Sequence, residues 1–517
     1  MLTAIFTLSG NLKRFLLVKK SIKISALLFI FASVFLKIAG LMRDIVIAYY
    51  FGDSYLADAF LAAFLLPNML ILFIQNGTKD VLIPGYYQYV QEKRENIYLF
   101  NVTISMLVFG AIVSLLVYTF APTIIQSFYP SFIKEAQSIA TTVIRMMMLV
   151  FVLVCLNAVL DSLLDIKRRY PVPVWTQSII WVTMIGFAII FANRWGVLSL
   201  AYGYITGVIV SSIIKLFTLK LDWWKKLSAS FDFSMTRHYF AHLFPVGFTI
   251  MIGQINLTVD SIFAGSFDEG AITYLNYAKS LVHLPQTLIP VMVGTILFPI
   301  ISKYYSENKI DKFQSTVKET FHLTFFLSLP AIVGMGIILL PLIRLIYERG
   351  AFDALASLST ATTGYYYLGS ALFFSINVVW NKALYTMQKG KYIFRISCIS
   401  ILLNIVLNYV LSNTLGFIGI PLASSIVGFY YTLATGFIYQ KLSSNKMKMN
   451  KTDLIVTIIS TICMVLGIFI IQSTFSTESN VMLLIAQIIT GIILYVGVSF
   501  ILKSYSLQFL TKIMSRK

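Results

Sequence analysis

Charged side chains stand inside stretches of this sequence that are otherwise apolar. The first such stretch, RDIVIAYYFGDSYLADAF over residues 43–60, carries Arg43, Asp44 and Asp58. Lys37 precedes Asp44 by seven residues, and at about 100° per residue both fall on nearly the same face of a helix. A charge at the centre of a bilayer costs at least about 2.5–3.5 kcal/mol on insertion scales, so such residues usually face a cavity or pair with each other.

Two interpretations of the carboxylates stay open. Gly52-Asp53-Ser54 is typical of a turn, so Arg43, Asp44 and Asp58 could form an ion-paired cluster that closes a helical hairpin. Alternatively, Asp44 and Asp58 could act directly in binding or in coupling. Lys79 and Asp80 are further charges of the same half.

In the second half, Asp260 and Lys279 are the charged candidates. Asn404 and Asn408 stand four residues apart and therefore share one helix face. Together with Asp260 and Ser424 they could supply oxygen ligands to a hard cation. Paired asparagines also commonly hydrogen-bond between membrane helices, which is the alternative interpretation.

Several other chemistries find no support in the sequence. His238 and His242 have a spacing that could hold a metal, but they follow Arg237 at a predicted helix edge, which favours interfacial packing. We therefore predict no metal site and no cofactor. No Walker A motif, nucleophile elbow or HExxH motif occurs, so we predict neither ATP hydrolysis nor any other enzymatic reaction. The three cysteines lie in apolar spans and indicate no disulfide framework.

The elements that must position these residues are membrane helices. The chain has 517 residues, of which 58% are hydrophobic and 12% charged. Apolar runs long enough to cross a hydrocarbon core of about 30 Å recur from end to end. We predict an all-α polytopic membrane protein with fourteen spans, near 24–50, 56–78, 100–122, 138–163, 172–192, 197–217, 239–264, 271–301, 321–346, 357–385, 392–412, 416–440, 453–473 and 480–502.

The distribution of basic residues predicts the orientation. If the N-terminus is cytoplasmic, the cytoplasmic segments hold 29 lysines and arginines, whereas the opposite loops hold Lys134, Arg194 and Arg349. This bias places both termini in the cytoplasm. It also accounts for the formal net charge of +19 without a nucleic-acid partner. Residues 1–23 are predicted to be a basic cytoplasmic segment and not a cleaved signal peptide.

The spans repeat in order. Short motifs recur at offsets near 213–222: Leu82-Ile83-Pro84 with Leu297-Phe298-Pro299, Pro122 with Pro341, Arg169-Tyr170 with Lys391-Tyr392, and Gly196 with Gly416. Six helices in each copy give both copies the same orientation in the membrane. We predict an N-lobe over residues 24–220, a C-lobe over 221–440, and two added helices with a cytoplasmic tail over 441–517. Parallel repeats that enclose a central site are typical of transporters that work by alternating access.

Ordered motifs in both halves resemble the MurJ (MviN) family, a group of lipid II flippases in the multidrug/oligosaccharidyl-lipid/polysaccharide exporter superfamily. The matching positions are Gly40–Asp44, Phe51-Gly52, Ala57–Phe60, Pro67-Asn68, Gly77, Ile83-Pro84, Gln254–Asn256, Asp260, Gly294–Pro299 and Glu348–Phe352.

The resemblance implies transport of undecaprenyl-diphosphate-linked disaccharide-pentapeptide from the inner to the outer leaflet of the bacterial cytoplasmic membrane. A diphosphate carries about two negative charges, and Arg43, Lys37, Lys79 and Lys279 are the cations available to contact it. The implied partners are the lipid-linked glycan, membrane lipids and cell-wall synthesis proteins. The expected energy source is a monovalent cation, protons or the membrane potential.

Departures from the family pattern leave the substrate open. The family usually carries arginine where this chain has Lys37, Ile71 and Ser280, and lysine lacks the fork with which arginine grips a phosphate. Lys279, beside Ser280, could restore one charge. The alternatives are a flippase for another polyprenyl-diphosphate-linked surface polysaccharide and a cation-coupled small-molecule antiporter with Asp58 or Asp260 as the coupling carboxylate. The excess of basic over acidic candidates favours an anionic substrate.

Overall fold

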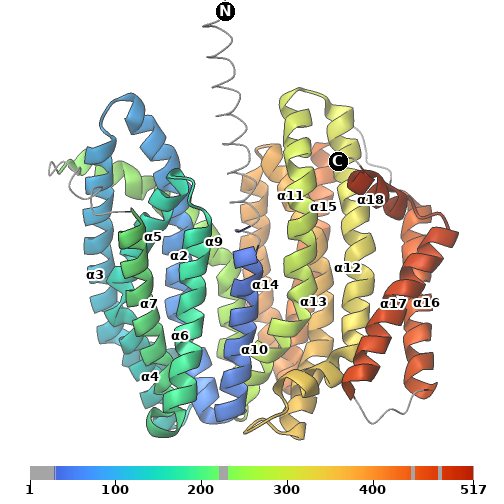
Figure 1. The fold of residues 1–517 in the computed structure, drawn as a ribbon, viewed down its shortest axis with the longest axis horizontal. Coiled ribbons are helices and arrows are strands. Elements are labelled where there is room, and N and C mark those ends of the chain that lie inside the picture. Colours follow the sequence, from blue (N-terminus) through green and yellow to red (C-terminus); the bar gives the residue numbers. More distant parts are fainter. Residues whose placement is uncertain (1–27, 29–30, 220–230, 444–448, 475–479, 516–517) are drawn as a thin grey trace, which may run out of the picture. The chain divides into compact units, whose positions relative to one another are not determined.

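The computed structural model describes residues 28, 31–219, 231–443, 449–474 and 480–515, and all regular structure within them is helical (Figure 1). The predicted cytoplasmic segment 1–23 lies outside these residues. The first helix covers residues 31–51. The helices that follow are α2 (Tyr55–Gln91), α3 (Glu95–Phe128), α4 (Lys134–Leu149), α5 (Phe151–Ile166), α6 (Pro171–Trp195), α7 (Leu198–Leu219), α9 (Phe233–Ala264), α10 (Ala271–Val282), α11 (Leu284–Ser306), α12 (Ile310–Tyr347), α13 (Ala354–Thr386), α14 (Gly390–Leu415), α15 (Gly419–Leu442), α16 (Lys451–Thr474), α17 (Asn480–Ile501) and α18 (Tyr505–Ser515).

The described helices follow the predicted spans. Eight of them are long and apolar enough to cross a membrane, or nine if the bent pair α4–α5 counts as one span. Large apolar side chains such as Ile470, Ile492 and Phe500 are exposed on α16 and α17, as expected of helices that face lipid. The helical membrane fold is thereby confirmed, while the number of fourteen spans and the orientation stay predictions.

Two of the predicted spans are broken helices. α4 and α5 meet at Val150 with a bend of 46°. α10 ends at Val282, and α11 has Pro285 in its first turn. Proline has no backbone N–H, which fits a helix start at the second break, although the sequence predicted an unbroken span over 271–301. No proline or glycine lies near Val150, so the first break has no comparable signal.

The chain forms two compact units. The first, called unit 1, contains the described residues up to 51 and residues 55–254, whereas unit 2 contains residues 52–54 and 255–515. In unit 1, α5 is the most enclosed element described here, with buried residues such as Val154, Ala158 and Leu160. In unit 2, α13 packs against α15 around Trp380 and Tyr439. The lobe limits at residues 220 and 440 stay predictions.

The repeat is visible in the backbone. Left-handed turns at Lys93, Arg168 and Gly196 recur at Asn308, Gln388 and Gly416, which lie 215, 220 and 220 residues later. Side chains other than glycine rarely adopt this conformation. Its recurrence at matched positions therefore fixes which residues of the two halves correspond.

The sequence did not predict α18, which lies in the segment expected to be a tail. The helix packs Leu507, Phe509 and Leu510 against hydrophobic residues of α11, α12 and α16. Asp453 of α16 accepts hydrogen bonds from the backbone N–H of Ser506 at 3.1 Å and from the Ser504 hydroxyl at 2.9 Å. These contacts hold the start of α18 on the body of unit 2.

Candidate functional site

Arg43 is held by groups from three elements of unit 1. Its guanidinium donates to Asp44 Oδ1 from Nη2 at 2.6 Å and from Nε at 3.1 Å. The guanidinium carbon lies 4.6 Å from the ring centre of Trp181 in α6 and 5.5 Å from that of Phe64 in α2. Such cation–π contacts fix the plane of the guanidinium as well as its position. Arg43 is therefore a rigidly oriented cation.

Asp44 and Asp58, predicted either to stabilise the hairpin or to act in binding or coupling, are both buried. The ion pair of Arg43 is with Asp44, its neighbour in sequence, and Asp44 is 3% exposed. Asp58 is also buried, in the first turn of α2. Whether these carboxylates act in binding or only in packing stays open as a prediction.

The structure gives the predicted lysines different surroundings. Lys37 is exposed and forms no ion pair with any residue that the structure describes. Lys79 of α2 forms an ion pair with Asp165 of α5. Lys279 of α10 forms an ion pair with Asp260 of α9, in unit 2. Arg43, Lys79 and Lys279 thus each hold a different carboxylate.

Unit 1 also holds an ion pair that was not predicted from the sequence. Lys215 of α7 is 1% exposed, and its ammonium lies 2.8 Å from Asp161 Oδ1 of α5. One turn away, Asp165 holds Lys79. Both Asp161 and Lys215 lie inside predicted spans, so a survey of every charge within the spans would have found them.

A small polar cavity adjoins this pair. Its volume is about 20 Å³, which is room for about one water molecule. The side chain of Asn157 borders it and donates to Ser212 Oγ at 3.0 Å, while Asn157 Oδ1 is buried without a partner among the described residues. The other polar lining residues are Asn68, Gln75, Gln177 and Lys215.

In unit 2, the residues predicted to bind a cation do meet. Asp260, Asn404, Asn408 and Ser424 come from α9, α14 and α15, and all belong to one hydrogen-bonded cluster. Lys279 of α10 completes it, with Nζ at 2.9 Å from Asp260 Oδ2. The cluster therefore includes a cation that is part of the chain itself.

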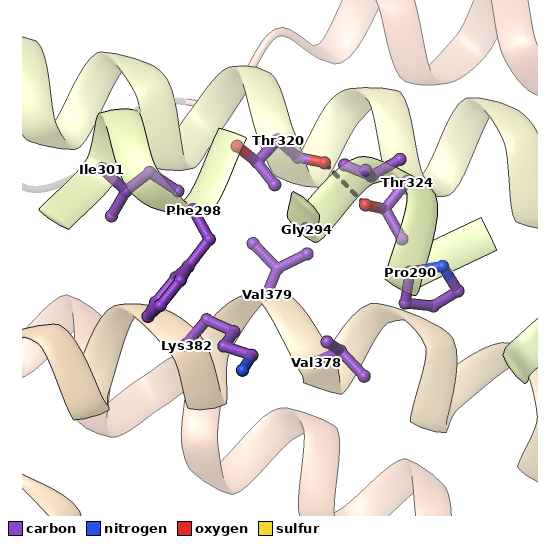
Figure 2. A pocket seen from close by; sticks show the side chains of 10 residues that line it. Pro290, Gly294, Phe298, Ile301, Thr320, Thr324, Val378, Val379 and Lys382 are labelled. Atoms are coloured by element: carbon purple, nitrogen blue, oxygen red, sulfur yellow. Dashed lines mark hydrogen bonds between the residues drawn. The ribbon is translucent and has the colours of Figure 1, made fainter. Parts of the chain in front are cut away.

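A second pocket of unit 2 lies between α11, α12 and α13 (Figure 2). Its lining is mostly apolar, with Pro290, Phe298 and Val379 among the side chains shown, and its volume is about 20 Å³. The ammonium of Lys382 stands 4.8 Å from the ring centre of Phe298. This volume is room for about one water molecule, and no other observation on the described residues points to a ligand there.

Comparisons with known proteins agree with the geometry. The family model for lipid II flippase MurJ matches residues 47–490. The chain is 28% identical over 478 residues to the lipid II flippase MurJ of Thermosipho africanus, covering 92% of this chain and 95% of that protein. It is 26% identical over 506 residues to the probable lipid II flippase MurJ of Rickettsia prowazekii, covering 93% and 97%.

Solved structures show the same fold. The inward closed conformation of a lipid II flippase MurJ superposes with a TM-score of 0.81 at 26% identity, covering 92% of this chain and 98% of that one. An inward-facing MATE family transporter of the MOP superfamily superposes with a TM-score of 0.68 at 13% identity, which shows the fold alone, and covers 79% of this chain and 94% of that one. The protein is accordingly a multi-pass protein of the bacterial cytoplasmic membrane. Since the family model spans most of the chain, it belongs to the lipid II flippase MurJ family.

Proposed function

We propose that this chain carries lipid II from the inner to the outer leaflet by alternating access of its two repeats, and that it catalyses no reaction of its own. The match of the family model over residues 47–490 carries the proposal, because it includes both repeats and the relatives found are named as lipid II flippases. Proteins of cell-wall synthesis are the proposed partners, since they would supply and consume this lipid.

Arg43 is the residue we propose as the main contact of the diphosphate. Its planar fork can hold two phosphate oxygens at once, and two of its N–H groups now donate to the single oxygen Asp44 Oδ1. Lys37, which has no ion-pair partner among the described residues, and Lys79 would add positive charge. Lys279, which the sequence assigned to the same role, would reach a diphosphate only by giving up Asp260.

The carboxylate partners suggest how the substrate can be released. A diphosphate that binds Arg43 or Lys79 must displace or share a carboxylate already in place. Leaving either carboxylate without its cation is unfavourable, so each carboxylate competes with the phosphate. A transporter needs this balance, because a site that bound the diphosphate without competition would not let it go.

A flippase for another polyprenyl-diphosphate-linked glycan is the second candidate. What favours it is that this chain carries Lys37, Ile71 and Ser280 at positions where the resemblance implies arginine. The energy source that we propose is a monovalent cation, protons or the membrane potential.

Depletion of the protein in its own cell tests the substrate. We expect lipid II to lose its accessibility at the outer leaflet, and complementation with Arg43→Ala to fail at normal protein abundance. Arg194→Ala, which removes an exposed arginine from the same unit, is the matched control and should complement. Unchanged lipid II exposure together with loss of a surface polysaccharide would replace the first candidate by the second.

A further inference from the structure

Asp260 of α9 is enclosed by side chains from four other helices of unit 2. The residue is 1% exposed, and its neighbours Asn404, Asn408 and Tyr367 are buried to the same degree. Lys279 Nζ lies 2.9 Å from Asp260 Oδ2 and 5.0 Å from the ring centre of Tyr367. The carboxylate and its counter-charge therefore share a closed environment with low solvent access.

The hydrogen bonds around Asp260 leave no free coordination position. Oδ1 accepts from Asn404 Nδ2 at 3.2 Å and from Asn408 Nδ2 at 3.0 Å. Oδ2 accepts from Lys279 Nζ at 2.9 Å, from Ser424 Oγ at 2.7 Å and from Tyr367 Oη at 3.3 Å. A carboxylate offers about four lone-pair sites, so these donors saturate it.

Two side chains of the cluster also point amide nitrogen atoms, which cannot bind a cation, toward the carboxylate. Hard cations require oxygen ligands, but the asparagines turn their amide nitrogens toward the carboxylate. Asn404 Oδ1 is itself engaged, because it accepts from Asn408 Nδ2 at 3.3 Å. A free cation could enter only if the ammonium of Lys279 left.

We propose that Lys279 is the built-in counter-ion of Asp260, so that this cluster is neutral and ordered without any free monovalent cation. Lys279 then acts as a positioning residue and is not a diphosphate ligand. Of the three energy sources, coupling to a monovalent cation at Asp260 is removed, and protons or the membrane potential remain. This last consequence rests on the proposed function, whereas the neutral cluster does not.

Removing the lysine should turn the cluster into a cation site. In Lys279→Met the apolar stem is kept while the ammonium is lost, which leaves Asp260 buried without its counter-charge. Asn408 Oδ1 is buried with no hydrogen-bond donor among the described residues, so it could join Asp260 and Ser424 as an oxygen ligand. A small cation supplied from solution would then take the place of the ammonium.

The test is thermal unfolding of the purified full-length protein in detergent, with sodium, potassium, ammonium or choline chloride at equal ionic strength. We expect the wild type to melt at the same temperature in all four salts. Lys279→Met should melt lower in choline and recover in a saturable way with at least one of the three small cations. The double variant Asp260→Asn/Lys279→Met should respond to none. Lys382→Met, which removes an exposed lysine from the same unit, should melt like the wild type.

Three results would overturn the proposal. One is a saturable rise of the wild-type melting temperature with sodium or potassium that Asp260→Asn abolishes. The others are Lys279→Met melting like the wild type in choline, and Lys279→Met gaining nothing from any small cation. In lipid II proteoliposomes, we expect the wild-type rate to stay the same when choline replaces sodium, and a fall would overturn the transport consequence. The unfolding test needs no lipid II, so failure of the proposed function would leave its result unaffected.

Discussion

Arg43 lies between one carboxylate and two aromatic rings, which allows the contribution of its charge to be separated from that of its shape. Arg43→Lys keeps the charge but loses the fork and the planar contact with Trp181 and Phe64. We expect transport of lipid II in proteoliposomes to fall at least tenfold, which is about 1.4 kcal/mol of lost substrate contact. The melting temperature should change little, because Asp44 keeps a cationic partner. An unchanged transport rate would show that only the charge matters.

Lys215 provides a second test at the level of single residues. Lys215→Met leaves Asp161 in a largely enclosed position without its cation and should lower the free energy of unfolding by about 2–3 kcal/mol, somewhat less than for a fully buried pair. Lys215→Met/Asp161→Asn should recover most of this loss, since no charge remains. The matched position of the second repeat already carries Asn381, seven residues before its left-handed turn. A double variant as unstable as the single one would contradict this explanation.

The sequence predicted some of these residues and not others for a physical reason. Arg43, Asp44, Asp260, Asn404 and Asn408 were recognisable because polar groups inside apolar runs are costly and therefore informative. Their partners were not recognisable, because a pairing such as Lys279 with Asp260 depends on how separate helices meet. The sequence predicts that the ammonium of Lys279 contacts a diphosphate. In the structure this ammonium forms an ion pair with Asp260 instead.

At the scale of elements, α6 and α7 approach closely at a glycine. A Cβ atom added to Gly203 of α7 would lie 2.6 Å from Met184 Cα and 2.7 Å from the Thr183 carbonyl oxygen of α6. Because both are backbone atoms, Gly203→Ala must push the helices apart and should lower the free energy of unfolding by about 1–3 kcal/mol.

Gly186 of α6 is the matched control for that substitution. Apart from the neighbouring backbone of α6 itself, no described atom lies within 4 Å of a Cβ built there, so Gly186→Ala should be neutral or should raise the free energy of unfolding by up to about 1 kcal/mol through helix propensity. Equal effects of the two alanines in a denaturant titration would argue against the close contact.

The docking of α18 can be tested by hydrogen exchange. An isolated helix of 11 residues is marginal in water, so α18 depends on its contacts with Asp453 and with the apolar residues beneath it. Asp453→Ala should increase exchange within α18 and leave the far end of α16 protected. Ser504→Ala, which removes one of the hydrogen bonds, should have a smaller effect. Unchanged protection of α18 in Asp453→Ala would show that apolar contacts alone suffice.

Element prediction succeeded where hydrophobicity alone decides the outcome. Long apolar runs predicted the helices. The break between α10 and α11, the bend at Val150 and the helix α18 were not predicted. Neither the bend nor α18 has a proline or a glycine nearby that would mark it in the sequence.

For the whole molecule, the distribution of lysine and arginine makes a topological prediction. In a chain whose native cysteines are replaced by alanine, Glu307→Cys should react only with a reagent present on the cytoplasmic side. Leu355→Cys, at a residue that is 70% exposed, should react only from outside. Labelling of both from the same side would contradict the fourteen-span topology. Two independent signals in the sequence, basic loops and ordered repeats, support this topology, which stays a prediction.

The matched left-handed turns carry a consequence for the origin of the chain. Six crossings bring a polypeptide back to the side where it began, so an ancestral half-length gene product could pair with its own copy side by side. Tandem duplication could then fuse the copies without inverting either one. If the two copies had the same sequence, each side chain would have to be compatible with its surroundings in both copies. A fusion of this kind would release that constraint, and the two halves do differ in this way, with Asp161 paired to Lys215 in one and Asn381 at the matched place in the other.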